Sequence, residues 1–168
     1  MRSARRKDGE FIVHEKYNDT SLENDVALIK FSFAAPFADA VQLVNLPNPD
    51  QVNLDGTMAV VAGFGKMGTN KTESNELRFA KRKILPSSDC QRPYKSNFQA
   101  NMHVCLDGSD GIATCPGDSG GPLVIEESDG SKTVVGISSF GDVTCDTGFP
   151  TIFTKVTTYV DWIKKHMK

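Results

Sequence analysis

Short apolar runs separated by turn-forming residues recur along this chain and constrain its fold more than any other feature. Gly, Asn, Asp and Pro lie between the runs, so each run can form only a short element. Six runs have this form: Phe11–Val13, Val26–Ile29, Met58–Ala62, Leu123–Ile125, Thr133–Val135 and Thr151–Phe153. Short strands punctuated in this way are typical of β-sandwiches and β-barrels. The sequence therefore predicts an all-β protein.

A helical period is visible only at the end of the chain. Five apolar residues there recur on one face of a helix: Val156, Tyr159, Val160, Ile163 and Met167. We expect Thr157 or Thr158 to be the N-cap, because a threonine hydroxyl can accept a hydrogen bond from a free N–H of the first turn. Lys164 and Lys165 suit the negative end of the helix dipole. A terminal helix packed on the β-structure is expected.

Composition excludes several classes of protein. The 168 residues include 19 Lys and Arg against 21 Asp and Glu, and 39% are hydrophobic. This is the composition of one globular unit, or of two small units sharing a core, and not of a disordered chain. A nearly neutral charge gives no electrostatic reason to expect nucleic acid. The apolar stretches are too short to span a membrane, so no membrane partner is expected either.

The cysteines and the first residues bear on the compartment. The four cysteines form no Cys-x-x-Cys or zinc-type array, so we expect disulfides and no metal, with three pairings open. Asn18-Asp19-Thr20 and Asn70-Lys71-Thr72 are N-glycosylation acceptors. Both features favour a secreted protein. Residues 1–7 are basic, but Asp8-Gly9-Glu10 follows where a signal peptide would be apolar, so we expect the sequence to be incomplete at its N-terminus.

The segment Cys115–Pro122 carries the strongest chemical signal. Most of its residues are Gly or Pro, which hold the backbone in a sharp turn around Ser119. Such a turn can expose the serine hydroxyl and gather backbone N–H groups around a negative oxygen, as acyl transfer requires. A plain surface turn is the alternative. The esterase motif Gly-x-Ser-x-Gly also fits, with Asp146 or Asp161 and His166 in the right order, but that fold needs a helix after the serine, and Pro122 and an apolar run follow instead.

Several segments in chain order resemble one protease family. They are Asn24–Ile29, Ala62–Gly65, Gly117–Pro122, Ser139–Gly141, Gly148–Val156 and Tyr159–Ile163. Gly117–Pro122 resembles the active-serine signature of the chymotrypsin/trypsin-like serine endopeptidases, and the other segments extend the resemblance over nearly the whole chain. It implies an all-β fold of two antiparallel six-stranded-type barrels, with the first barrel incomplete, and a C-terminal α-helix.

The resemblance also implies a division of the chain. Residues 1–46 would be a remnant of the first barrel with a basic N-terminal tail, and residues 47–56 the connection between the barrels. Residues 57–155 would form the second barrel with the active serine, and residues 156–168 the helix. The prolines of residues 36–56 and their lack of a strand period independently favour a connection there.

Roles in catalysis follow from the same resemblance. Ser119 would be the nucleophile, and the N–H groups of Gly117 and Ser119 the oxyanion hole. Asp25 would orient a catalytic histidine, and Asp118 would pair with a freed terminal amine. The implied disulfides are Cys90–Cys105 and Cys115–Cys145.

The implied substrate-binding residues are Ala113, Thr114, Ser139, Phe140, Gly141 and Thr151. Ala113 carries no charge to pair with Lys or Arg, so a trypsin-like preference is not expected. Gly141 would leave the mouth of the primary pocket open, whereas Thr151 would shorten the pocket. We therefore expect a preference for uncharged, apolar residues of small to middle size.

The catalytic base is missing from this pattern. None of His14, His103 and His166 occupies the family's catalytic position, and no Ile-Val-Gly-Gly-like segment is present. We expect a secreted serine endopeptidase, monomeric when complete, with protein or peptide substrates, protein protease inhibitors as further partners, and no cofactor. For these 168 residues themselves we expect little or no activity. The alternative is a non-catalytic homologue that acts as a binding protein.

Overall fold

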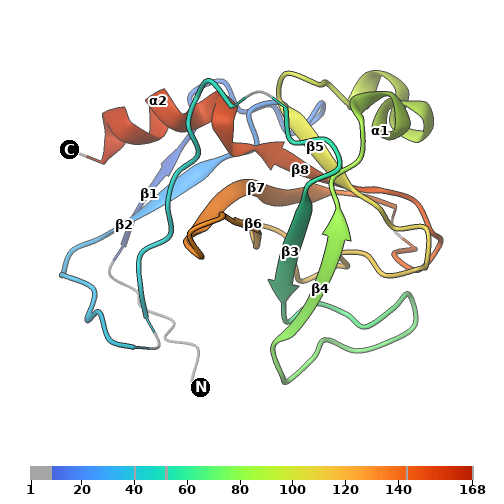
Figure 1. Cartoon of the computed structure of the whole chain (residues 1–168), viewed down its shortest axis with the longest axis horizontal. Helices are drawn as coiled ribbons and strands as arrows, with labels where there is room; N and C mark the ends of the chain where they lie inside the picture. Colours follow the sequence, from blue (N-terminus) through green and yellow to red (C-terminus); the bar gives the residue numbers. More distant parts are fainter. Residues whose placement is uncertain (1–8, 40, 52, 143, 168) are drawn as a thin grey trace.

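The structure is a computed structural model that describes residues 9–39, 41–51, 53–142 and 144–167 (Figure 1). The strands are β1 (Gly9–Val13), β2 (Ala27–Phe31), β3 (Met58–Gly63), β4 (Arg78–Lys83), β5 (His103–Leu106), β6 (Pro122–Glu126), β7 (Lys132–Phe140) and β8 (Thr151–Lys155). The helices are α1 (Ser87–Tyr94), the short 3₁₀ helix η1 (Lys95–Asn97) and α2 (Val156–His166). The basic segment predicted at residues 1–7 lies outside the described residues.

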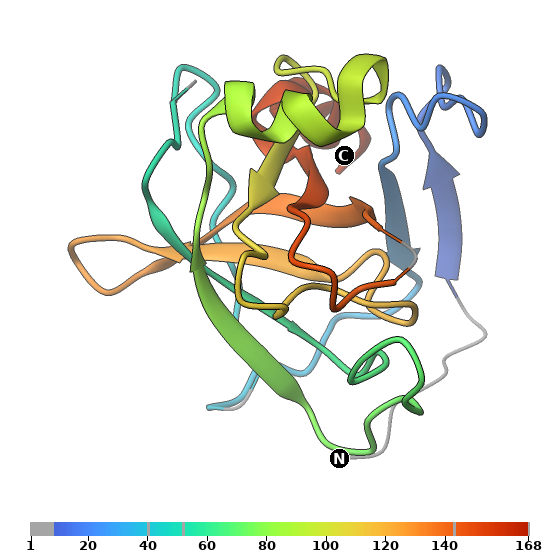
Figure 2. The same cartoon turned by 90° about the vertical axis from the view of Figure 1, so that its right-hand side faces the viewer.

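Six strands form one curled antiparallel sheet in the order β4-β3-β6-β7-β8-β5. A bridge between Ile84 and Leu106 joins the two ends of this order, so the sheet curls toward a barrel (Figure 2). Side chains alternate along β3 and β6, which bury Ala59, Leu123 and Ile125 in the interior together with Phe153 of β8. This interior is one of three buried apolar clusters in the described residues and keeps water away from the strand ladders. The prediction of an all-β fold is confirmed.

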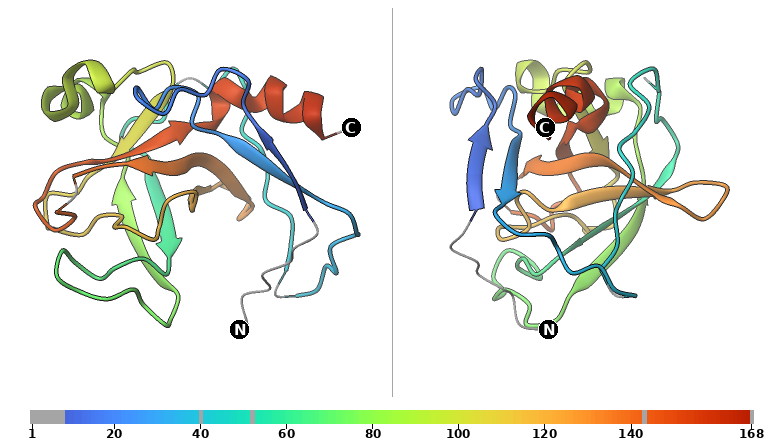
Figure 3. Two further views of the ribbon diagram at one scale, coloured as in Figure 1. Left: turned by 180° about the vertical axis from the view of Figure 1, so that it is seen from behind. Right: turned by 90° about the vertical axis from the view of Figure 1, so that its left-hand side faces the viewer.

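Two strands stand apart from the curled sheet. β1 and β2 pair antiparallel, with Phe11 opposite Ile29, and form a ribbon beside α2 (Figures 1 and 3). One face of the ribbon turns Leu28 toward α2, where it packs with Val26 and Tyr159. The opposite face is apolar as well, and Phe11 and Ile29 are 70% and 54% exposed there. The ribbon is therefore held through one face only.

Helix α2 confirms the predicted C-terminal helix but not its cap. β8 runs directly into the helix, and Lys155 is the N-cap without a side-chain hydrogen bond. The prediction of Thr157 or Thr158 as N-cap was wrong, because both lie within the first turn. Thr158 instead donates its hydroxyl to the carbonyl of Asn101, at 2.5 Å.

The expectation of a single helix was also wrong. α1 and η1 lie between β4 and β5, and α1 buries only Cys90, so it lacks the apolar stripe that reveals a helix in sequence. Among the described residues, no helix has the length and apolar character needed to cross a membrane.

Candidate active site

Ser119 lies exposed in a tight turn that leads directly into β6. The turn is closed by hydrogen bonds from the Asp118 N–H to the Cys115 carbonyl at 3.0 Å and from the Gly121 N–H to the Asp118 carbonyl at 2.9 Å. Gly117 and Gly120 adopt φ values of 101° and 79°, which a residue with a side chain rarely adopts. The glycines of the sequence motif therefore serve the backbone path that exposes the serine.

Two N–H groups of this turn are left free for a ligand. Within the described part of the chain, neither the Gly117 N–H nor the Ser119 N–H donates a hydrogen bond to another protein group. Free backbone donors beside a serine hydroxyl are what stabilisation of an oxyanion requires. These are the two groups that the sequence analysis assigned to that role.

Asp118 is satisfied by backbone donors. Its Oδ1 accepts a hydrogen bond from the Gly65 N–H at 2.7 Å, and its Oδ2 accepts one from the Cys115 N–H at 3.0 Å. A Cβ on Gly63 would lie 2.0 Å from Asp118 Oδ1, and a Cβ on Gly65 would lie 2.4 Å from Asp118 Cγ. Gly63 and Gly65 therefore make room for this carboxylate, a role that sequence reasoning missed although their spacing was visible.

A cavity of about 190 Å³ lies beside Asp118. Its lining includes Ala113 and Thr114, two of the predicted substrate-binding residues, together with Lys66 and Arg78. The other four predicted residues do not line it. Ser139, Phe140 and Gly141 lie on or just after β7, and Thr151 begins β8.

Gly141 and Thr151 do face each other. A Cβ on Gly141 would be 3.4 Å from Thr151 Cγ2, an ordinary van der Waals contact, and Thr151 itself is 97% buried, being 3% exposed. The predicted substrate-binding residues thus fall into two groups, one in the cavity beside Asp118 and one along β7 and β8.

Asp25 is held against β7 and β8. Ser139 donates its hydroxyl to Asp25 Oδ2 at 2.6 Å, and Thr154 donates to the Asp25 backbone carbonyl at 2.8 Å. The carbonyl of Ser138, the neighbour of Ser139, accepts a hydrogen bond from the Gly120 N–H at 2.8 Å. Adjacent residues of β7 therefore bind the two loops that carry Asp25 and Ser119. No sequence signal pointed to Thr154.

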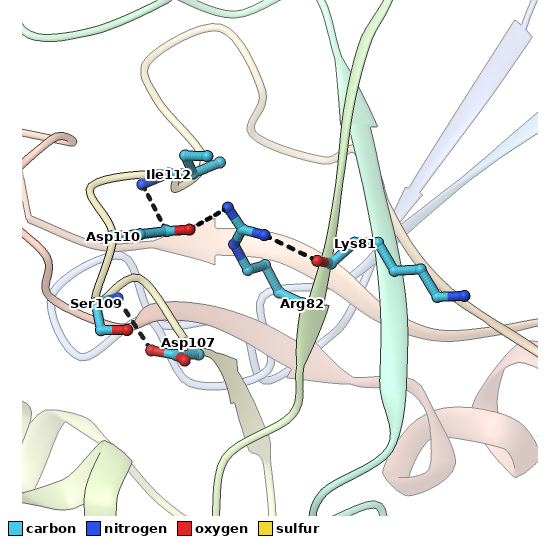
Figure 4. Close-up of polar contacts among 6 residues, drawn as sticks. All are labelled: Lys81, Arg82, Asp107, Ser109, Asp110 and Ile112. Atoms are coloured by element: carbon cyan, nitrogen blue, oxygen red, sulfur yellow. Dashed lines mark hydrogen bonds and ion pairs between the residues drawn. The ribbon is translucent and has the colours of Figure 1, made fainter.

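Two disulfides and one ion pair fix the surrounding loops. Cys115–Cys145 ties the serine turn to the loop after β7, and Cys90–Cys105 ties α1 to β5, as the resemblance implied. In the loop between β5 and the serine turn, Asp110 accepts a hydrogen bond from the Ile112 N–H and pairs with Arg82 of β4 at 2.5 Å (Figure 4). The loop that carries Ala113 is thereby anchored to the sheet.

The three histidines lie elsewhere. The ring of His14 lies 5.0 Å from the ring of Trp162, and His166 lies within salt-bridge distance of Glu15, at 3.4 Å. His103 is 2% exposed on β5. In the described residues, no hydrogen bond joins any of them to Ser119 or Asp25. A group positioned to take the serine proton is thus not found among them.

Burial dominates the electrostatics of His103. Desolvation lowers the pKa of His103 from its usual 6.5, because the charged ring would lose its water. A hydrogen bond with the backbone of Leu22 and the charges of Asp25 and Glu23 raise the pKa and partly offset this effect.

Within the described residues, no group of three or more His, Cys, Asp or Glu could hold a metal ion.

The chain is similar to known proteins over most of its length. A family model described as Trypsin matches residues 2–163. Chymotrypsin-C of Bos taurus is 35% identical over 159 residues, which are 93% of this chain and 59% of that protein. Brachyurin of Leptuca pugilator is 35% identical over 157 residues, which are 92% of this chain and 66% of that protein.

A solved structure titled as an HL collagenase superimposes with a TM-score of 0.79 and is 31% identical. The match covers 94% of this chain and 67% of that one. The chain spans between 59% and 66% of the length of the two curated relatives named above.

Proposed function

Because the chain belongs to the trypsin family, we propose that it carries the nucleophile half of a serine endopeptidase site, with Ser119 as the nucleophile. The Gly117 and Ser119 N–H groups bind the oxygen of the attacked carbonyl, and Asp25 orients the base. The substrates are proteins or peptides. One observation carries the proposal: adjacent residues of β7 bind the loop of Asp25 and the loop of Ser119, at 2.6 Å and 2.8 Å respectively.

The proposed chemistry needs a proton acceptor. A serine hydroxyl is a weak nucleophile until a base removes its proton during attack on the carbonyl carbon. The attack forms a tetrahedral intermediate whose oxygen is stabilised by the two N–H groups, and loss of the amine leaves an acyl group on Ser119. None of His14, His103 and His166 is hydrogen-bonded to Ser119 in the described residues. The 168-residue polypeptide on its own therefore has little or no peptidase activity.

We assign the primary pocket to uncharged, apolar residues of small to middle size. Ala113 itself is uncharged, although Lys66 and Arg78 line the same cavity, and the methyl group of Thr151 lies against Gly141 outside that cavity. Secretion and a monomeric state belong to the same proposal, as do protein protease inhibitors as partners. The division of the chain into two β-units connected by residues 47–56, with a helix that begins at residue 156, is also part of this proposal.

Labelling with a fluorophosphonate tests the role of Ser119. The reagent phosphonylates an activated serine hydroxyl, and fluoride leaves. We expect slow labelling of the 168-residue chain, located at Ser119 by mass spectrometry and absent in Ser119→Ala. Labelling spread over several serines would overturn the assignment of the nucleophile. A rate typical of active serine proteases would overturn the proposed inactivity.

The position of the three histidines favours a second candidate, a binding protein on the same fold. The same Ser119→Ala variant separates the two. If the chain binds a protein protease inhibitor with an affinity that Ser119→Ala leaves unchanged, and no fluorophosphonate reacts, the binding function is the better description.

A further inference from the structure

His103 sits at a buried junction that the proposed mechanism does not use. Its side chain is almost fully buried on β5, with ring centroids 5.9 Å from Phe98 and 5.3 Å from Phe140. Its Nδ1 accepts a hydrogen bond from the Gln99 N–H at 3.1 Å. A buried imidazole with specific partners on more than one segment does more than fill space.

The loop that carries Asp25 is packed against this junction. Leu22 and Asn24 have φ values of 57° and 55°, a left-handed conformation that costs energy for residues with side chains. External contacts must therefore hold the loop in place. Glu23 accepts a hydrogen bond from the side chain of Gln99, and the backbone N–H of Gln99 donates to His103 Nδ1.

The strand next to His103 completes the attachment. His103 pairs with Thr154 of β8 in the sheet, and Thr154 donates its hydroxyl to the Asp25 carbonyl. Ser139 of β7 holds the carboxylate. Thr154 and Ser139 thus bind Asp25 directly, His103 is linked to Glu23 through Gln99, and the three residues lie on three adjacent strands; we call them the loop clamp.

Only the neutral form of His103 suits its hydrogen bond with Gln99. Nδ1 accepts from the Gln99 N–H, so the single proton of the neutral ring lies on Nε2. A second proton on Nδ1 would point at the Gln99 N–H and break that bond. The charged groups that face the ring are Glu23 and Asp25, both on the clamped loop, and burial outweighs their favourable charges.

We propose that His103 is a proton-sensitive positioning residue: as a neutral ring it holds residues 22–25, and with them Asp25, against the sheet, and its protonation releases this loop. The proton comes from solvent and is bound at Nδ1, and no covalent bond changes. The consequence for catalysis rests on the proposed role of Asp25, whereas release of the loop does not. Acidification then withdraws Asp25 from the site.

Hydrogen exchange of the 168-residue chain at two pH values tests the proposal. Peptides that cover residues 14–26 are followed above and below pH 6.5, and rates are corrected for the intrinsic effect of pH. We expect protection of these residues to fall at least about tenfold between pH 7.5 and pH 5, while β3 and β6 keep their protection. Protection of residues 14–26 that does not depend on pH would overturn the proposal.

Two variants of similar size separate positioning from packing. His103→Gln keeps a side-chain acceptor for the Gln99 N–H and does not titrate, so we expect protection close to wild type at both pH values. His103→Met fills the space with only a weak acceptor, so the loop should be open at both. Equal behaviour of the two variants would show that His103 only packs. His14→Gln and His166→Gln serve as controls and should keep the wild-type pH dependence.

An NMR titration of the His103 ring gives a second measurement that needs no variant. The ring should titrate below 6.5, with Nε2 protonated in the neutral form, and the amide signals of residues 22–25 should change with the same midpoint. A midpoint at or above 6.5, or loop signals that do not follow it, would overturn the proposal. The outcome of the fluorophosphonate test of Ser119 does not depend on either result.

Discussion

Gly65 shows how a missing side chain can determine the position of a charged one. A Cβ at this position would lie 2.5 Å from both carboxylate oxygens of Asp118, and the Gly65 N–H donates to one of them. Asp118 is adjacent to Ser119, so any displacement of the carboxylate moves the proposed nucleophile.

We predict that Gly65→Ala destabilises the chain by at least about 2 kcal/mol, through overpacking and a weakened hydrogen bond to a charged group. Urea unfolding measures the change. Gly141→Ala is the matched control, because its Cβ would meet nothing closer than 3.4 Å. Equal stabilities for the two variants would show that the Asp118 contact imposes no such constraint.

The lowered pKa of His103 leads to a second prediction at the residue scale, which concerns the pH dependence of stability. The folded-state pKa lies below the unfolded value of 6.5, so between these two values the unfolded chain binds more protons. The contribution of His103 to stability is therefore fully present above pH 6.5 and is lost as pH falls toward the folded-state pKa. Urea unfolding at about pH 7.5 and about pH 5.5 should show this loss, and His103→Gln should remove it.

Two carboxylates with lowered pKa values, Asp142 and Asp146, do not confound that window. The pKa values of Asp142 and Asp146 are lowered from 3.8, chiefly by hydrogen bonds with Thr144 and Thr69 respectively, so their stabilising effect is lost only below that range. A stability that stayed constant from pH 7.5 to pH 5.5 in the wild type would contradict the burial of a neutral His103.

At the scale of elements, the six predicted apolar runs all overlap described strands, whereas β4 and β5 were missed. The apolar runs at residues 58–62 and 123–125 form β3 and β6. In both strands alternate side chains are buried in the core. β4 was missed because its sequence, Arg78–Lys83, is mostly charged and its outer face meets solvent. Its place in the sheet depends on pairing with β3, a long-range contact that no local pattern contains.

The residues of the candidate site also differ in whether the sequence predicts that they lie together. Ser119, Gly117 and Asp118 lie within one short motif, so sequence alone brings them together. The bond from Ser139 to Asp25 spans 114 positions, and the one from Thr154 to Asp25 spans 129. The resemblance named Ser139 without stating this contact, and Thr154 has no local signature because its role depends on how β8 meets the Asp25 loop.

Helix α1 is joined to β5 by a covalent bond and has only a small apolar face, formed by Cys90 and Tyr94. It contains Pro93 and buries only Cys90, which is joined to Cys105 of β5. We predict that the double variant Cys90→Ala/Cys105→Ala loses about 3 kcal/mol of stability, the entropic contribution of a 15-residue closed loop. Amides 87–94 should lose their protection in hydrogen exchange before those of β3 do.

The other disulfide provides the comparison. Cys115→Ala/Cys145→Ala opens the serine turn and the loop after β7, so protection should be lost around residues 115–121 while α1 keeps it. If both double variants lost protection over the same residues, the two disulfides would not stabilise separate elements.

At the scale of the whole molecule, the β1–β2 ribbon and the six-stranded sheet differ in how they are supported. The sheet surrounds a buried core that includes Leu123, Val135 and Phe153, each 0% exposed. The ribbon exposes the apolar face of Phe11 and Ile29 and is attached through α2 and the loop clamp. Strands with few buried contacts open at a lower free energy than core strands.

We predict that amides of residues 9–46 exchange much faster than those of residues 57–155, by about a hundredfold or more in the 168-residue chain at neutral pH.

Trp162 offers an independent probe, because its indole N–H donates to Glu15 at 2.8 Å across the junction between the β1–β2 unit and α2. Its fluorescence should change in urea before the far-ultraviolet signal of the sheet. Leu28→Ala, which weakens the packing on α2, should widen the gap between the two transitions, whereas Phe11→Ala on the exposed face should leave it unchanged. Coincident transitions together with equal protection would mean that the ribbon and the sheet unfold as one cooperative unit.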